Sequence, residues 1–267
     1  MKTLPWDYNI HSHTFRCGHA EGSDEEYVEA AIDAGFRYMG FSDHVFLPGI
    51  IHKTMRGEIS LLGDYISSVN ALKEKYKDKI KIHLGFEAEY MPEFLTYYKD
   101  LLENKGMEYL ILGQHCYFAY GKTHWYTAHH TVEEAIKLYT DDLIAGMRSD
   151  LFRYVAHPDF FMIYEKSWGE AHIEAAYRIA RESKALGIPL EINASQGRRY
   201  GKGGFDPMRD MTYPYPPFWK IVSEIGCDVV IGIDAHKPSH YKNADYDFLI
   251  RFVKEQNLKL ITHCPLD

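Results

Sequence analysis

The sequence of 267 residues lacks several features that mark large classes of protein. Its four cysteines (Cys17, Cys116, Cys227 and Cys264) are widely spaced and form no C-x-x-C pair, so a disulfide framework is not expected and a reducing, cytoplasmic location is the default. No apolar run reaches transmembrane length, and no basic-then-apolar segment opens the chain, so no membrane association is expected. The G-x-G-x-x-G and P-loop motifs of nucleotide-binding folds are also missing.

Positive charge is scarce as well. Lys and Arg total 30 against 38 Asp and Glu, which gives a formal net charge of -8. This balance argues against a protein that works on nucleic acid or on an anionic membrane, although it leaves room for a local basic pocket. Histidine, in contrast, is abundant, with 15 residues in the chain.

Short apolar runs alternate with helical segments along the whole chain. The predicted strands are the runs 7–11, 37–43, 80–87, 108–115, 153–157, 188–193, 227–234 and 258–263. Helical patterns lie between them, with capping boxes at Ser23–Glu26 and Thr131–Glu134 and a glycine stop at Gly187. Strand–helix alternation predicts parallel strands, and seven or eight such units predict an α/β single domain over residues 1–267 that forms a closed or nearly closed (β/α) barrel. An open doubly wound sheet is the alternative.

Two connecting segments are unusual. The segment 117–130 is rich in aromatic residues and histidine, and we expect it either to fold over the mouth of the barrel or to form a small core of its own. The segment 195–217 carries Arg198, Arg199 and several glycines. Long loops in a compact domain are usually functional or mobile.

Potential metal ligands stand at the ends of the predicted strands. They are His11 and His13, Asp43 and His44, Glu87, His115, His157, and Asp234 with His236, and His19 can return from the first loop. Because the carboxyl ends of parallel barrel strands open on one face, we expect these groups to converge. Imidazole binds Zn, Fe and Mn, and carboxylates can bridge two ions. A lone histidine at a strand end is usually structural, but so many polar groups at one barrel end would be costly to pack without ions.

Seven short motifs resemble, in their order along the chain, those of the polymerase and histidinol phosphatase (PHP) family. They are H-S-H-T-F-R-C-G-H-A at the start, S-D-H at 42–44, G-F-E-A-E-Y at 85–90, G-Q-H at 113–115, A-H-P-D at 156–159, E-I-N at 191–193 and G-I-D-A-H at 232–236. The resemblance covers nearly the whole chain, and its closest form is the bacterial histidinol-phosphatase branch. It implies a distorted seven-stranded, TIM-like (β/α)7 barrel that holds three divalent metal ions, with Zn, Fe or Mn as candidates.

The resemblance also implies which residues hold each ion. The first ion would be held by His11, His13, Glu87 and Asp234; the second by Glu87 as a bridge together with His115 and His157; and the third by His19, His44 and His236. No ligand of the pattern is missing. The eighth apolar run, with His263, exceeds the seven strands of the family and receives no role.

The implied reaction is hydrolysis of L-histidinol phosphate to L-histidinol and phosphate, a step of histidine biosynthesis, by attack of a metal-bridging hydroxide. Glu87, Asp234, His236 and Asp43 are the candidate catalytic residues. The proton donor to the leaving group stays open among His236, Asp43 and Asp206, and Asp43 also reads as a partner that orients a ligand histidine. Glu89 is interpreted as a carboxylate that either supports the site or is solvated.

Arginine suits phosphate because its planar guanidinium matches two phosphate oxygens. Arg16 lies among the ligand motifs, and Arg198 and Arg199 follow the sixth predicted strand, so these three are the candidates for phosphate binding. The expected partner is a small-molecule phosphate ester, and the oligomeric state is open.

Two other functions are compatible with the same residues. One is a phosphodiesterase or exonuclease on nucleotides or nucleic-acid ends, against which the net charge of -8 counts. The other is a non-catalytic metal-binding accessory domain, which would be expected to have lost ligands. Hydrolysis of an amide by a similar metal barrel is not excluded by ligand types alone.

Overall fold

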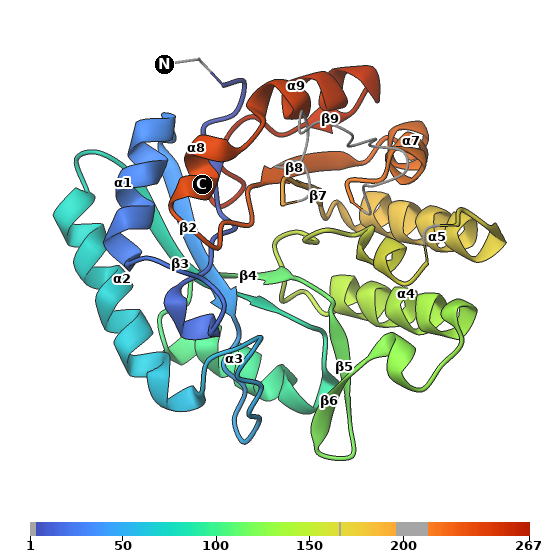
Figure 1. The fold of residues 1–267 in the computed structure, drawn as a ribbon, viewed down its shortest axis with the longest axis horizontal. Helices are drawn as coiled ribbons and strands as arrows, with labels where there is room; N and C mark the ends of the chain where they lie inside the picture. Colours follow the sequence, from blue (N-terminus) through green and yellow to red (C-terminus); the bar gives the residue numbers. More distant parts are fainter. Residues whose placement is uncertain (1–3, 166, 196–212) are drawn as a thin grey trace.

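The computed structural model describes residues 4–165, 167–195 and 213–267 (Figure 1). Its strands are β1 Tyr8–Asn9, β2 Tyr38–His44, β3 Lys81–Ala88, β4 Tyr109–Leu112, β5 Cys116–Ala119, β6 Lys122–Trp125, β7 Leu190–Asn193, β8 Asp228–Gly232 and β9 Lys259–Leu260. Its α-helices are α1 Asp24–Ala34, α2 Leu62–Tyr76, α3 Leu95–Asn104, α4 Val132–Arg148, α5 Glu170–Leu186, α7 Pro216–Ile225, α8 Ser239–Asn243 and α9 Tyr246–Glu255.

The strands of the barrel are parallel throughout and follow the order β1-β2-β3-β4 in one half and β7-β8-β9 in the other. Val155 joins the two halves, because it makes parallel bridges to Leu112 at the end of β4 and to Leu190 of β7. A bridge between Ser12 and Ala235 brings the segment after β1 against the segment after β8. The predicted strand 153–157 is thus reduced to one residue, Val155, with two bridges, and the predicted distorted, TIM-like barrel is confirmed.

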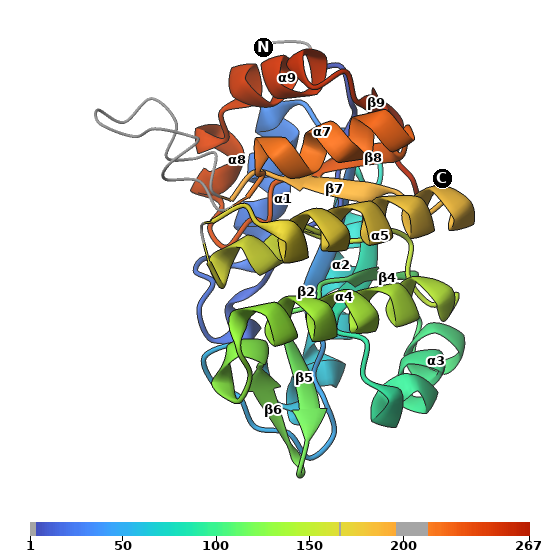
Figure 2. The ribbon, with the colours of Figure 1, turned by 90° about the vertical axis from the view of Figure 1, so that its right-hand side faces the viewer.

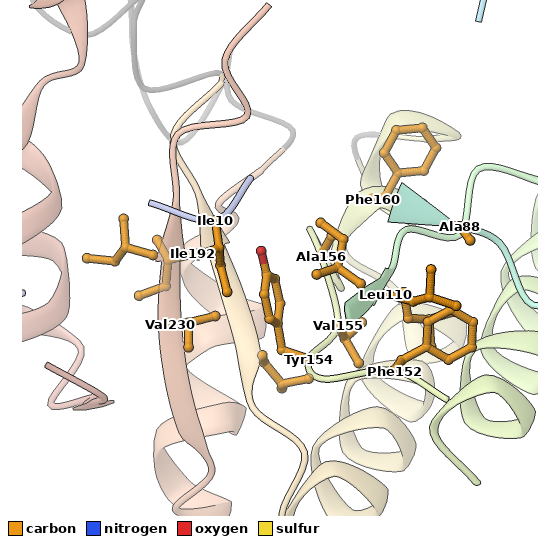
Figure 3. Close-up of a cluster of buried hydrophobic side chains, with 14 of the residues drawn as sticks. Ile10, Ala88, Leu110, Phe152, Tyr154, Val155, Ala156, Phe160, Ile192 and Val230 are labelled. Carbon is orange, nitrogen blue, oxygen red and sulfur yellow. The ribbon is translucent and has the colours of Figure 1, made fainter. Parts of the chain in front are cut away.

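Helices cover the outside of this curled sheet (Figures 1 and 2). The capping boxes predicted at Ser23 and Thr131 are both formed, with each hydroxyl accepting from the backbone N–H three residues on. The barrel interior is apolar, and Figure 3 shows Ile10, Tyr154, Ile192 and Val230 in one buried cluster. Polar side chains that are buried at one end of such a core need hydrogen-bonding or ionic partners there.

The segment 117–130 differs from the loop predicted there. It forms most of an antiparallel hairpin of β5 and β6, which projects from the body of the fold in both views (Figures 1 and 2). The turn consists of Tyr120 and Gly121, which both have positive φ angles, 52° and 77°. Two-residue hairpin turns that match the twist of their strands need such angles, so Gly121 is the residue of the sequence that indicates a hairpin turn here.

Part of the second unusual segment, 196–212, lies outside the described residues, and Arg198, Arg199 and Asp206 lie there with it. Within the described ranges, no helix has both the length and the apolar character needed to cross a membrane.

Candidate metal centre

The predicted ligands come together at the carboxyl ends of the parallel strands. His11 and His13 follow β1, His44 is the last residue of β2, and Glu87 is the last residue but one of β3. Most of the nine side chains are buried, whereas His236 is half-buried and His19 is exposed. The cluster therefore runs from a buried floor to a rim that solvent can reach.

Glu87 lies at the centre of the cluster, with imidazoles on both carboxylate oxygens. Oε1 is 2.8 Å from His157 Nε2 and 3.5 Å from His115 Nε2. Oε2 is 3.1 Å from His44 Nδ1 and 3.5 Å from His13 Nε2. One carboxylate thus faces donors from four other segments, as a bridging ligand must.

Asp234 completes the floor from the other side. Its Oδ1 lies 3.2 Å from His13 Nε2, 3.6 Å from His11 Nε2 and 3.2 Å from His236 Nδ1. His11 Nε2 is also 3.6 Å from Glu87 Oε2, so it faces both carboxylates. These four residues are the set that the family resemblance implied for the first ion.

Several of these imidazole nitrogens are buried without a hydrogen-bond partner among the described residues. They are His11 Nε2, both ring nitrogens of His13, His157 Nδ1 and His236 Nε2. An unsatisfied buried polar group costs about 1–3 kcal/mol, so such a collection needs an explanation. Nitrogen and carboxylate donors gathered in this way fit Zn, Mn or Fe, and their ligand atoms form several groups in which all atoms lie within 4.8 Å of one another.

One of these groups is His19, His44 and His236, the set implied for the third ion. The His236 ring stacks on His13 at 4.0 Å between centroids, so the third group adjoins the first. Cys17 also lies within 4.8 Å of His13 and His236. Burial raises the pKa of the Cys17 thiol, which keeps it protonated and a poor ligand.

The charges in the cluster are mutually dependent. Burial by itself raises the pKa of Glu87, but the imidazoles of His115 and His11 outweigh it and hold that pKa well below its usual range. Burial, followed by the neighbouring imidazole of His13, lowers the pKa of both His44 and His236. Glu87 is therefore ionised and the imidazoles of His44 and His236 are neutral, which are the forms that bind metal. At His11, His13 and His157, in contrast, burial is outweighed by the neighbouring carboxylates, which raise the pKa.

Two of the nine residues have an unusual backbone. His157 has φ 30° and Asp234 has φ 52°, in a region that non-glycine residues seldom adopt. Each lies two residues after a strand position of the barrel, His157 after Val155 and Asp234 after Gly232. Such angles persist where the surrounding structure enforces them, and here they turn two ligand side chains toward the cluster.

Asp43 does not reach the cavity, which corrects its candidacy as a catalytic residue. Its carboxylate is buried and accepts hydrogen bonds from the Thr14 hydroxyl and from the His44 N–H at 2.9 Å. It also lies 3.7 Å from His13 Nδ1, on the side of that ring away from Asp234. The alternative interpretation, that Asp43 orients a ligand histidine, agrees with this position.

Glu89 is buried behind His115, and not solvated. It lies 3.2 Å from His115 Nδ1 and forms an ion pair of 2.9 Å with Arg56. Burial raises the pKa of Glu89, but Arg56 and His115 lower it to about 2, so the carboxylate is charged. Arg56 has no role in the sequence-based interpretation, since nothing in its neighbourhood marks it as buried.

Arg16 is not available for phosphate in this structure, which corrects that expectation. Its side chain is 3% exposed, and the guanidinium binds both carboxylate oxygens of Asp24, at 2.8 and 3.0 Å. It also binds Asp64 at 2.7 Å. Arg16 therefore ties the first loop to α1 and α2 and does not face the ligand cluster.

A cavity of about 230 Å³ opens onto the cluster. Its described lining consists of His19, His44, His52, Thr54, Met55, Glu87, His115, Trp125, His157, Phe160, Tyr213, Asp234 and His236. Trp125 belongs to β6, so the hairpin does reach the mouth. Phe160 and Tyr213 form an aromatic wall beside His157, with ring centroids 5.3 and 5.9 Å from it. His52 and Tyr213 were missed by the sequence analysis, since only the tertiary fold brings them to the mouth.

Comparison with known proteins gives one family and several relatives. Residues 9–195 match the PHP domain family. A probable histidinol-phosphatase of Deinococcus radiodurans is 28% identical over 234 residues, which cover 85% of this chain and 85% of that protein. A probable histidinol-phosphatase of Schizosaccharomyces pombe is 24% identical over 260 residues, 88% of this chain and 81% of that one.

Among solved structures, histidinol phosphate phosphatase of Lactococcus lactis in complex with Zn, L-histidinol and phosphate has a similar fold. The TM-score is 0.72 at 18% sequence identity, and the superposition covers 98% of each chain. At this identity the likeness concerns the fold, so the chemistry of the present chain has to be argued from its own residues.

Proposed function

The chain belongs to the PHP domain family, and we propose that it is a metal-dependent phosphomonoesterase that hydrolyses L-histidinol phosphate to L-histidinol and phosphate. The observation that carries the proposal is the convergence of nine imidazole and carboxylate groups from both halves of the barrel, with the carboxylate of Glu87 at their centre. The metal chemistry rests on this geometry, and the substrate rests on the relatives.

We assign three divalent ions to the cluster. The first would be held by His11, His13, Glu87 and Asp234, the second by Glu87, His115 and His157, and the third by His19, His44 and His236. The short distances around Glu87 and the unpartnered ring nitrogens support this assignment. Zn, Mn and Fe all suit nitrogen and oxygen donors of this kind.

When bound, such ions act as Lewis acids that activate water and neutralise phosphate charge. The protein supplies the rest. Glu87 and Asp234 bring two negative charges to the floor of the cavity, next to the buried imidazoles of His11, His13 and His157. His236 is half-buried and lines the cavity as a proposed ligand of the third ion, whereas Asp43 does not line the cavity.

The cavity also suits the organic part of the substrate. Phe160, Tyr213 and Trp125 present aromatic surface at its mouth, against which a flat imidazole ring can pack. Among the described lining residues there is no Lys or Arg. We therefore keep Arg198 and Arg199, which lie outside the described residues, as the proposed phosphate-binding side chains.

The functional unit extends beyond the family match. That match ends at residue 195, but Asp234 and His236 contribute to the cluster and the Ser12–Ala235 bridge holds their segment against β1. We therefore propose that residues 1–267 act as one domain. The four free, buried cysteines agree with a reducing compartment, and we propose the cytoplasm.

Steady-state kinetics on a matched panel of phosphate esters test the proposal, after the bound metals have been measured. The panel contains histidinol phosphate, an imidazolyl alkyl phosphate without the amine, phosphoethanolamine without the ring, an aryl phosphate and a short oligonucleotide. We expect the highest kcat/KM for histidinol phosphate. A value no better than that for the aryl phosphate would refute the substrate but keep the reaction class, and cleavage of the oligonucleotide alone would favour a nuclease.

A further inference from the structure

Glu191 is a buried carboxylate that the proposed reaction does not use. It lies in β7, its side chain is fully buried, and its Oε2 is 2.7 Å from Nδ1 of His11. The other ring nitrogen of His11, Nε2, faces Glu87 and Asp234 and has no hydrogen-bond partner among the described residues. His11 is therefore held between a carboxylate behind it and the proposed ion site in front of it.

No lysine or arginine in the described part of the chain forms an ion pair with Glu191. Glu89, the buried carboxylate behind His115, differs in having Arg56 as its partner. The neighbours of Glu191 are Asn193 and Tyr154, which hydrogen-bond to it, and His11, whose imidazole pairs with it at 2.7 Å. An ionised carboxylate without a fixed cation in an apolar interior is unfavourable, unless a positive charge lies close by.

Asn193 extends the contact to a second ligand. Its amide Nδ2 donates to Glu191 Oε1 at 2.7 Å and to Asp234 Oδ2 at 3.3 Å. Asn193 and Glu191 lie two residues apart on β7 and so point to the same face of the sheet. The pair thus touches one ligand from β1 and one from the end of β8.

We propose that Glu191, with Asn193, is a positioning residue for the first metal ion: it fixes the tautomer and ring orientation of His11 and supplies the buried negative charge that this ion neutralises. The inference rests on the proposed ion site, but not on the substrate. A proton on Nδ1, held by Glu191, leaves the lone pair of Nε2 free for an ion. Without the carboxylate, either nitrogen could carry the proton, and the ring with the proton on Nε2 could not bind an ion through that atom.

The direct test is Glu191→Gln, which keeps size and shape but removes the charge and lets the amide donate to Nδ1. The probe is Zn²⁺ alone, titrated into metal-free protein against a competing chelator. We expect the tightest class of site to weaken by about 10–100-fold, the usual effect of removing a group behind a ligand. With Co²⁺ in place of Zn²⁺, we expect the visible absorption band of that site to shift.

A matched control exists at the opposite end of the same sheet. Glu108 lies 2.7 Å from Nδ1 of His83, the same separation as in the Glu191–His11 pair, but His83 lies at the start of β3, four residues before Glu87. Glu108→Gln therefore removes a carboxylate from an imidazole without touching the ion site. Its Zn²⁺ affinity should equal that of the wild type.

A second variant keeps Glu191 and moves it. Gly232 faces Asn193 across β7 and β8, and a Cβ at this position would overlap Oε2 of Glu191. Gly232→Ala should therefore displace the carboxylate from His11 and weaken Zn²⁺ binding in the same direction. Gly63→Ala in α2, where a Cβ meets no atom within 4 Å, is the control for adding a methyl group.

The outcomes separate the alternatives. If E191Q and G232A lower the melting temperature of the metal-free protein but bind Zn²⁺ as tightly as the wild type, Glu191 is merely structural and the inference is wrong. Should E191Q fail to fold, G232A alone decides in the same way. A wild-type protein that binds Zn²⁺ tightly but does not hydrolyse histidinol phosphate would refute the proposed substrate and leave this inference intact.

Discussion

Gly113 has no side chain at the point where the carboxylate of Glu87 passes it, and a Cβ there would overlap Oε1 and Cδ of Glu87. Gly113 directly follows β4, and Glu87 belongs to the neighbouring strand β3. The φ angle of Gly113 is not positive, so the backbone itself would accept another residue. The glycine in the G-Q-H motif is therefore required by space, because it lets the carboxylate reach His157 and His115.

Gly113→Ala should consequently disable the site without unfolding the chain. The added methyl group forces the Glu87 carboxylate away from His157, and we expect kcat/KM to fall by at least about 10-fold, as for a change just behind a metal ligand. Steady-state kinetics and metal content per chain are the measurements. Gly63→Ala serves as the control, and equal activity of both variants would contradict the crowding seen here.

Glu87→Gln tests the bridging role itself. The amide has one oxygen instead of two equivalent charged ones, so it cannot present a negative oxygen to His157 on one side and to His44 on the other. We expect turnover to fall by more than the roughly 100-fold typical of groups behind a ligand, and about one ion per chain to be lost. Turnover close to that of the wild type in the metal-loaded variant would sink the proposed role of Glu87.

Trp125 should influence substrate binding more than chemistry. It lines the mouth of the cavity and is 45% exposed, which leaves ring surface free for an incoming imidazole. An aromatic contact of about 1 kcal/mol corresponds to a 5–10-fold rise in KM for histidinol phosphate in Trp125→Ala, with kcat little changed. Tyr120→Ala, at the 98%-exposed tip of the same hairpin, should have no effect.

The KM of Trp125→Ala for phosphoethanolamine, which has no ring, should match that of the wild type. A loss that is equal for both esters would mean that Trp125 shapes the cavity in general and does not recognise the ring.

Arg16 should behave as a structural residue. Its removal leaves Asp24 buried without its cation, and breaking such a pair costs about 3 kcal/mol, at the low end of the usual range because Asp64 is largely exposed. Urea denaturation of Arg16→Gln measures this loss. Arg148→Gln, which breaks a pair with Glu182 at the surface, should cost less than about 1 kcal/mol.

The KM for histidinol phosphate in Arg16→Gln should stay within about twofold of the wild-type value, a change of less than half a kcal/mol. A large rise in KM without loss of stability would restore the phosphate-binding role expected from the sequence.

Asp142 makes stability depend on pH in an unusual direction. Burial, with Asp141 and Glu93 as smaller contributors, raises the pKa of Asp142 from 3.8 to about 6, although the Tyr126 hydroxyl donates to it at 2.5 Å. Between these two values the folded state holds a proton that the unfolded state has released, so the contribution of Asp142 to stability falls as pH rises from 4 to 6. Above pH 6 the folded state carries the buried charge.

Asp142→Asn does not titrate. Its free energy of unfolding relative to the wild type should therefore increase by about 1–2 kcal/mol between pH 4 and pH 7, measured by urea denaturation of metal-free protein. Asp141→Asn should show the opposite trend, because Lys137 and Arg178 more than offset the effect of burial and lower the pKa of Asp141. A difference between Asp142→Asn and the wild type that does not vary with pH would contradict the raised pKa.

The sequence was most informative where structure depends on near neighbours. Alternation of apolar runs and helices located the strands, and the boxes at Ser23 and Thr131 located two helix starts, because caps are formed within four residues. The ligands His11, Glu87 and Asp234 stand out for a related reason. Parallel strands carry their carboxyl ends to one face, so a residue's place in its strand already predicts where it goes.

The sequence was least informative about which buried charges pair. The position of Arg16 among the motifs predicts a phosphate-binding side chain, but in the structure its guanidinium forms ion pairs with Asp24 and Asp64. The hairpin at 116–125 was predicted as a loop because its strands are only four residues long and their alternation is weak. No pattern along the chain predicts the ion pair between Arg56 and Glu89, which are 33 residues apart.

By itself, the sequence determined the kind of barrel and the face that bears the candidate ligands, because both follow from short-range periodicity and from the direction of parallel strands, while the assignment of those ligands to ions was implied by the family resemblance. Only the tertiary structure decided what stands behind those groups. Glu191 contacts His11 across 180 residues of chain, and Gly113 makes room for Glu87, because packing between elements, and not order along the chain, selects the partner of a buried charge.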